Sequence, residues 1–111
     1  MTDPGYRLLH RIVRTDPPTQ DDFVSNAAEG RPPPADPDRR AVWDGLSVYS
    51  TEAQARRKRR ASPILGPYIA VLRVPTDGSV RIERTLVGDG HHTIWGEPDR
   101  LLALVVAVIP A

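Results

Sequence analysis

The sequence predicts a single α+β domain, built from a mixed, mainly antiparallel sheet with three to four short helices. Its 111 residues match the usual size of one domain. Short segments with apolar residues at every second position alternate with segments that begin at helix-capping residues, which are the patterns of strands and helices. The Pro-rich segment 30–37 is too short to divide the chain, so residues 1–111 are treated as one domain with an internal linker.

Five segments are expected to form strands, because their apolar residues recur with period two or they are rich in β-branched residues. They are residues 6–14, 46–50, 68–74, 79–87 and 105–109. The segment 68–74 is nearly continuous in apolar residues, as in a strand covered on both faces, so we expect it in the interior of the sheet. The turn PTDG places Gly78 where positive φ is needed and predicts that 79–87 returns as the hairpin partner of 68–74.

Two helix signals stand in the first half of the chain. Thr19 and Asp22 have the spacing of a capping box, and they predict a helix over 19–29 that ends at a glycine. Asp36 is followed by proline, a common pair at the N-cap and first helical position. This pair predicts a short helix over 37–44.

Two further helix signals follow. Thr51 and Gln54 form a second capping-box pattern, which predicts a helix over 52–61 whose only apolar contacts are alanines. Pro98 can begin one helical turn before the last strand. The segment 88–98, interrupted by glycines, is expected to be a loop between these elements.

The composition excludes several classes of function. The chain has no cysteine, which rules out disulfides and cysteine-based zinc sites. Fifteen basic and 14 acidic residues give a net charge of +1, so the charge of the whole chain does not indicate a nucleic-acid binder. The longest apolar run, residues 101–109, is far shorter than the ~20 residues that span a bilayer. We expect a cytoplasmic protein that does not enter the membrane, from a bacterium with a GC-rich genome, because arginine, alanine and proline are abundant beside a single lysine.

The run RRKRR at residues 56–60 is the most basic part of the sequence. Five consecutive helical residues turn through ~400°, so these cations surround the helix and cannot all face one groove. We therefore interpret the run as the solvated face of a helix. The alternative is a phosphate-binding patch, extended by Arg39 and Arg40, which would make the helix 52–61 an accessory nucleic-acid contact. No aromatic residues for base stacking lie within the run.

The adjacent histidines His91 and His92 have no third ligand at a standard spacing, so no metal site is expected. A histidine on a loop can contact a substrate or donate a proton, and we take His92 as the catalytic candidate of the pair. The alternative is that these rings only satisfy the backbone of their loop. The sequence contains no phosphate-binding loop, dinucleotide fingerprint or nucleophile elbow.

The phrase GLSVYSTEAQA, residues 45–55, resembles the middle segment of small ADP-ribosyltransferase-like domains. In that family a short strand after a glycine carries Tyr or Ser-Thr, and a helix with a spaced alanine follows directly. The resemblance implies that NAD⁺ lies in a cleft between two small sheets. It also implies an enzyme of toxin or mobile-element type that cleaves the nicotinamide bond.

The resemblance assigns roles to particular residues. Arg7 or His10 would hold the dinucleotide, because a guanidinium neutralises pyrophosphate. Tyr49 would stack on nicotinamide. The site would be braced by Ser50 or Thr51.

The family also uses a late acid, and in this sequence that residue would be Glu83 or, failing that, Glu97. A carboxylate there would stabilise the positive charge that develops on the ribose when the nicotinamide bond breaks. The paired-acid patterns of the family, Glu-x-Glu or Gln-x-Glu, are absent around Glu83, where the sequence reads IERT.

Two other functions remain open. The chain can be a non-catalytic interaction module of the antitoxin or immunity type, which binds a protein partner through the basic helix and the segment HHTIWG. That hypothesis predicts an exposed apolar patch around Trp43 or Trp95. The other is the nucleic-acid accessory role of the basic helix, which predicts binding that weakens steeply with salt.

Overall fold

The computed structural model describes residues 5–85 and 90–111. They form one six-stranded sheet in the order β4-β5-β2-β1-β3-β6, in which each neighbouring pair is antiparallel. The strands are β1 (Tyr6–Val13), β2 (Leu46–Tyr49), β3 (Tyr68–Pro75), β4 (Arg81–Arg84), β5 (His91–Trp95) and β6 (Val105–Pro110). The predicted α+β class with a mainly antiparallel sheet is therefore confirmed, and β3 lies inside the sheet as expected.

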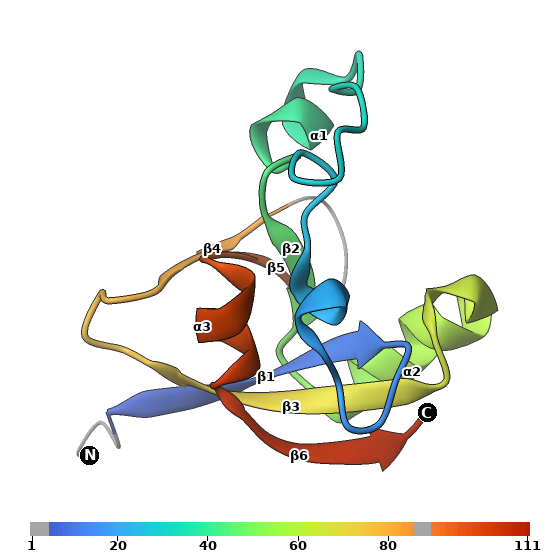
Figure 1. The fold of residues 1–111 in the computed structure, drawn as a ribbon, viewed down its shortest axis with the longest axis vertical. Helices are drawn as coiled ribbons and strands as arrows, with labels where there is room; N and C mark the ends of the chain where they lie inside the picture. The colour runs from blue at the N-terminus through green and yellow to red at the C-terminus, as the bar shows by residue number, and fades with distance from the viewer. Residues whose placement is uncertain (1–4, 86–89) are drawn as a thin grey trace.

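Three α-helices and two short 3-10 helices accompany the sheet within these residues (Figure 1). They are α1 (Pro37–Ala41), α2 (Glu52–Ala61), α3 (Pro98–Leu102), η1 (Gln20–Phe23) and η2 (Pro63–Leu65). The caps predicted at Asp36 and at Thr51 form as expected. Asp36 accepts a hydrogen bond from the Asp38 amide at the start of α1, and Thr51 accepts one from the Gln54 amide at the start of α2.

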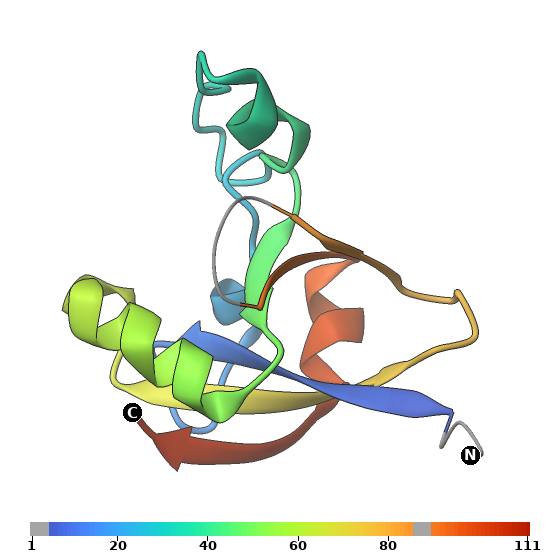
Figure 2. The same cartoon turned by 180° about the vertical axis from the view of Figure 1, so that it is seen from behind.

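The sheet consists of two wings that meet at a single pair of residues. β1 and β3 pair along their whole length, from Tyr6 opposite Pro75 to Val13 opposite Tyr68. By contrast, β1 and β2 pair only where His10 lies opposite Tyr49. Figures 1 and 2 show β2 running at a steep angle to β1 and β3. The wing β1–β3–β6 and the wing β2–β5–β4 therefore splay apart beyond that pair.

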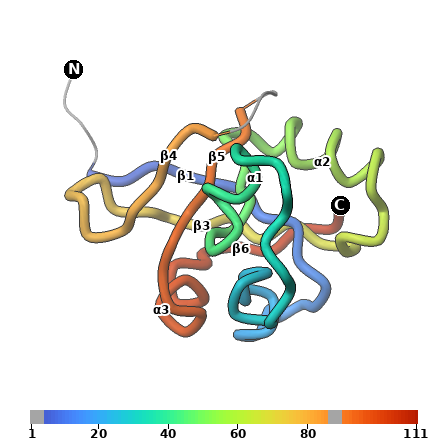
Figure 3. The backbone as a smooth tube through the Cα atoms, turned by 90° about the horizontal axis from the view of Figure 1, so that it is seen from above, coloured from blue at the N-terminus to red at the C-terminus, as the bar shows by residue number. Residues whose placement is uncertain are grey.

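The main hydrophobic core lies on one face of the sheet. Its fully buried members come from both wings and from the elements that cover them, and they include Leu9, Phe23, Val48, Leu72, Val74, Ile94 and Leu101. η1 and α3 pack against each other over this face, and Figure 3 shows both on the side of β1 and β3 opposite to α2. The predicted alternation of β2 is confirmed, since Leu46 and Val48 face this core and Tyr49 does not.

A smaller core lies under α2 on the other face. Ile12, Tyr49 and Ile69 pack there against Ala55, the one buried residue of the helix. Such a contact is small, and α2 depends on its cap and its arginine stems as well as on apolar burial. The expectation that only alanines anchor this helix is confirmed.

The predicted helix over 19–29 is wrong. Only η1 forms, and Val24 already has an extended backbone. The Asp22 carboxylate accepts from the Thr19 amide at 3.1 Å, as the spacing predicted, but it also accepts from the Arg14 amide at 2.8 Å and the Thr15 hydroxyl at 2.7 Å. These bonds tie the turn to the end of β1 and use the carboxylate that would otherwise only cap a helix.

The predicted hairpin between 68–74 and 79–87 is also wrong. β3 has β1 and β6 as its two neighbours, and β4 pairs with β5 at the opposite edge of the sheet. The pairing places Ile82 opposite Ile94, which joins β4 to the main core. Residues 86–87 of that predicted strand lie outside the described residues.

The expected loop over 88–98 contains a strand. Residues 91–95 form β5, between β4 and β2, while residues 88–89 lie outside the described residues. Glycines on both sides suggested a loop, but here they only bound a strand. Gly45, just before β2, allows β5 to pack closely, because a side chain at this position would overlap Thr93 and the Trp95 indole of β5.

No helix within the described ranges is long and apolar enough to cross a membrane.

Candidate functional site

A groove of about 1080 Å³ lies on the face of β2, β5 and β4 that is opposite to the main core. The wall on one side is α2, with Gln54, Arg57 and Lys58, and on the other side α1 with the residues just before it. The floor is formed by strand residues and the residue after β4: Ser47, Tyr49, Arg81, Glu83, Thr85 and His91. These residues line one surface because side chains alternate between the two faces of a strand, so every second residue of the paired strands lies on the same face.

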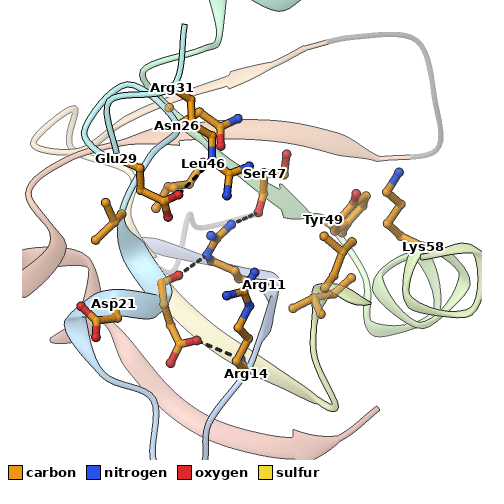
Figure 4. A pocket seen from close by; sticks show the side chains of 15 residues that line it. Arg11, Arg14, Asp21, Asn26, Glu29, Arg31, Leu46, Ser47, Tyr49 and Lys58 are labelled. Carbon is orange, nitrogen blue, oxygen red and sulfur yellow. Dashed lines mark hydrogen bonds and ion pairs between the residues drawn. The ribbon is translucent and has the colours of Figure 1, made fainter. Parts of the chain in front are cut away.

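A second cavity of about 290 Å³ adjoins the groove where the two wings splay apart. Ser47, Tyr49 and Lys58 line both spaces. Arg11 fills the gap, donating from Nε to the Asp22 carbonyl at 2.8 Å and from Nη1 to the Ser47 carbonyl at 2.9 Å (Figure 4). Desolvation lowers the pKa of Arg11 to about 10, against the opposing effect of Asp22, and the guanidinium stays charged at neutral pH.

His91 occupies the centre of the groove floor with both ring nitrogens hydrogen-bonded. Its Nδ1 lies 2.9 Å from the Thr85 carbonyl, and its Nε2 lies 3.0 Å from the Ser47 hydroxyl. A carbonyl only accepts, so Nδ1 carries the proton and Nε2 accepts from Ser47. Burial lowers the pKa of His91, and His92 and Lys58 lower it further, while the bond to Thr85 acts against them. The ring is therefore neutral at pH 7, with a basic nitrogen directed at a hydroxyl.

Tyr49 stands beside this pair. Its ring meets that of His91 edge to face, with centroids 5.5 Å apart and an angle of 81°. The ring is buried against Ile12 and Ala55, so it forms part of the groove floor and not an open stacking platform. Desolvation raises the pKa of Tyr49, although Arg11 acts in the opposite sense. Its hydroxyl makes no hydrogen bond to a residue in the described ranges.

The charges around the groove are unevenly distributed. Arg81 pairs with Glu83 at 3.4 Å and stacks over the Trp95 ring at 3.9 Å. Arg39 is 3.9 Å from Asp36 on the far wall. Lys58, by contrast, forms no ion pair with any residue that the structure describes. The wall formed by α2 therefore offers a cation at the point where groove and cavity meet.

The structure brings two predicted catalytic residues together in the groove, Tyr49 and Glu83. The third, His92, lies on the opposite face, because it pairs with Val48 of the main core. Arg7 lies there as well, 3.4 Å from His92. The fallback acid Glu97 precedes α3, away from the groove.

The other residues predicted at the site, His10, Ser50 and Thr51, lie next to the groove and hold the elements that form it. His10 is 3.2 Å from the Tyr49 carbonyl, at the one pair that joins the wings. The Ser50 hydroxyl donates to the Gln54 side chain at 2.6 Å, and Thr51 caps α2. Ser50 and Thr51 thus fix the end of the helix that carries Lys58.

The basic run is distributed around α2 as the helical period requires. Arg56 pairs with Glu52 at 3.0 Å, and Arg59 donates to the Gly66 carbonyl at 3.3 Å. Arg57 and Lys58 face the groove. The run is therefore not a single cationic face.

The tryptophans do not form an exposed apolar patch. The Trp43 indole donates to the Arg31 carbonyl at 3.1 Å, and the Trp95 indole donates to Asp44 at 2.9 Å. Both side chains are half-buried. Among the described residues, the large apolar side chains that are exposed lie elsewhere, at Leu8, Ile64, Leu65 and Val106.

The sequence did not predict that Ser47, His91 and Lys58 lie together in one site. The predicted alternation of β2 does put Ser47 on the face of Tyr49, which is one available signal. Reading HHTIW as a strand would have put His91 and His92 on opposite faces. No family model, curated protein or solved structure matches this chain.

Proposed function

We propose that the groove binds a nucleotide through its phosphates, with NAD⁺ as the first ligand to test. The observation that carries the proposal is Lys58, a cation without an ion partner among the described residues, at the junction of two cavities. A phosphate in the groove would pair with this ammonium group, and charge-assisted hydrogen bonds to phosphate are strong. The volume of the groove, about 1080 Å³, is just above the ~300–1000 Å³ that is usual for small-molecule sites.

The arrangement supports an ADP-ribosyltransferase-like role in modified form. Tyr49 would border the bound base or nicotinamide with the edge of its ring, and Glu83 would be the late acid. The phosphate contact falls to Lys58 and not to Arg7, which lies on the other face with His92. The cleft between two small sheets that the family uses corresponds here to two wings of one sheet, joined at His10 and Tyr49.

The test is an NMR titration of ¹⁵N-labelled protein with NAD⁺, ADP and inorganic phosphate in parallel. We expect amide shifts clustered at residues 47–58 and 81–85, with NAD⁺ and ADP binding more tightly than phosphate. Lys58→Met is expected to weaken nucleotide binding about 10-fold or more, as loss of a charge-assisted bond predicts.

Arg60→Met is the matched control, because it removes one positive charge from the exposed side of the same helix. Equal weakening of nucleotide binding in both variants would mean that binding depends only on the overall charge of α2 and not on a contact with Lys58. No shifts at millimolar nucleotide would reject the proposal. Strong, salt-sensitive binding of an oligonucleotide instead would favour the nucleic-acid role.

A further inference from the structure

We propose that Ser47 is a nucleophile activated by His91, and that the groove hydrolyses small carboxylic esters through an acyl-serine intermediate. This inference uses the same groove as the proposed function but requires no nucleotide. It rests on three aligned groups: the Ser47 hydroxyl, the His91 ring and the Thr85 carbonyl.

The geometry is that of a nucleophile, its base and a group that orients the base. Ser47 Oγ is 3.0 Å from His91 Nε2, and His91 Nδ1 is 2.9 Å from the Thr85 carbonyl. The carbonyl fixes the tautomer and the plane of the ring, as a carboxylate does in the familiar triads. The Thr85 hydroxyl also bonds to the Thr93 hydroxyl, which ties residue 85 to β5.

The position of each group is set by the sheet. Ser47 lies opposite Thr93 in the β2–β5 register, and His91 lies opposite Tyr49. The Arg11 guanidinium donates to the Ser47 carbonyl and holds that end of β2 in place. Ser47 itself is exposed and lines the groove, so a substrate can reach its hydroxyl.

The reaction balances without a cofactor. Ser47 Oγ attacks the ester carbonyl carbon while its proton passes to His91 Nε2. The bond to the leaving alkoxide then breaks, and the alkoxide takes this proton and departs as the alcohol. Water, deprotonated by the same nitrogen, attacks the acyl-serine, releases the carboxylic acid and returns the proton to Ser47.

Two hydrogen-bond donors in the groove can stabilise the oxyanion that forms. They are the Tyr49 hydroxyl, which makes no bond to a described residue, and the Lys58 ammonium. Both lie on the face of Ser47, from β2 itself and from α2. An ester that carries a negative charge is therefore the preferred substrate class.

The first experiment is labelling of the intact chain with a fluorophosphonate, followed by peptide mass spectrometry. The probe forms a bond between Ser47 Oγ and phosphorus, expels fluoride, and leaves the proton on His91. We expect one adduct, at Ser47, which is lost in Ser47→Ala and forms at least ~100-fold more slowly in His91→Gln. His92→Gln, on the other face, is expected to retain the labelling rate.

The pH profile adds a measurement that a structural role would not affect. The labelling rate should rise as His91 loses its proton, with a midpoint below the ordinary ~6.5 of histidine, and then stay level. A rate that is unchanged in His91→Gln, or an adduct at another serine, would overturn the proposal.

A second variant keeps the proposal testable if Ser47→Ala does not fold. The chain has no cysteine, so Ser47→Cys introduces a single thiol beside His91, and Ser79→Cys introduces one on an exposed turn. We expect iodoacetamide to alkylate the former at least ~10-fold faster at pH 6.5, because a neighbouring imidazole favours the thiolate. Equal rates would reject activation by His91. Since neither reagent contains a nucleotide, failure here is distinct from failure of nucleotide binding.

Discussion

The two faces of β2 carry opposite kinds of contact within four residues. Leu46 and Val48 enter the main core, where Val48 is fully buried. On the other face, Ser47 bonds to His91 and Arg11, and Tyr49 packs in the smaller core while it lines the groove together with Ser47 and Lys58. Because the first face supplies the burial that holds β2 and β5 together, the second face can keep polar groups that contribute little to stability. The predictions below test this division.

The largest effect is expected on the core face. Ile94→Ala removes most of a fully buried side chain that lies opposite Leu46 and Ile82 in the sheet. We expect the free energy of unfolding to fall by about 2–5 kcal/mol, from lost burial and the cavity left behind. Urea denaturation followed by circular dichroism measures this.

Val106→Ala is the comparison, because Val106 is 58% exposed on the edge strand. Its expected cost is under about 0.5 kcal/mol. Similar losses for both variants would show that the core is not concentrated on the face we describe. If Ile94→Ala does not fold, Ile94→Val should still cost about 0.5–1.5 kcal/mol.

An intermediate effect is expected at Asp22, which ties η1 to the end of β1. Burial by itself raises the pKa of this carboxyl, but hydrogen bonds from Thr15, Arg14 and Thr19, with the charge of Arg11, outweigh it and lower the pKa overall. Asp22→Asn keeps the shape and loses the charge, so we expect the free energy of unfolding at pH 7 to fall by about 1–3 kcal/mol.

The pH dependence has a definite sign. Because the pKa of Asp22 is lowered in the folded state, its stabilisation is fully present above the unfolded value of ~3.9 and is lost as the pH falls toward the folded value. The difference between wild type and Asp22→Asn should therefore be larger at pH 7 than at pH 3. Asp21→Asn, at the exposed neighbour, is the control, and an equal pH dependence in both variants would contradict the assignment.

The parts of the fold that sequence predicts are those fixed by neighbouring residues. The cap at Thr51 and the pair Asp36–Pro37 each locate a helix start, and alternation locates β1 and β2 with their faces. These signals are local, since each depends on residues within a turn or strand. Thr19 shows the limit, because its capping partner Asp22 is shared with the backbone of β1, a contact that local spacing does not reveal.

Strand pairing is the part that the sequence does not show. A turn signal after β3 predicted a hairpin, yet β4 lies at the other edge, where Ile82 meets Ile94. Pairing between distant segments depends on which apolar faces fit together, and several partners satisfy the same pattern. The candidate site depends on that pairing, because the β2–β5 register alone brings Ser47 and His91 within hydrogen-bond distance.

The smallest effect on stability is expected at Tyr49→Phe, and this variant separates stability from chemistry. The change keeps the buried ring against Ile12 and Ala55 and removes a hydroxyl without a hydrogen bond to a described residue. The free energy of unfolding should therefore change by less than about 0.5 kcal/mol. If the hydroxyl stabilises the oxyanion, fluorophosphonate labelling of Ser47 should nevertheless slow about 10-fold or more.

Tyr6→Phe provides the matched control, because Tyr6 lies at the far end of β1 under the Arg73 guanidinium. It should change neither stability nor labelling. A loss of stability in Tyr49→Phe without slower labelling would mean that the hydroxyl belongs to the fold. The groove face would then contribute to folding in the same way as the core face, and the division between the two faces of β2 would not hold.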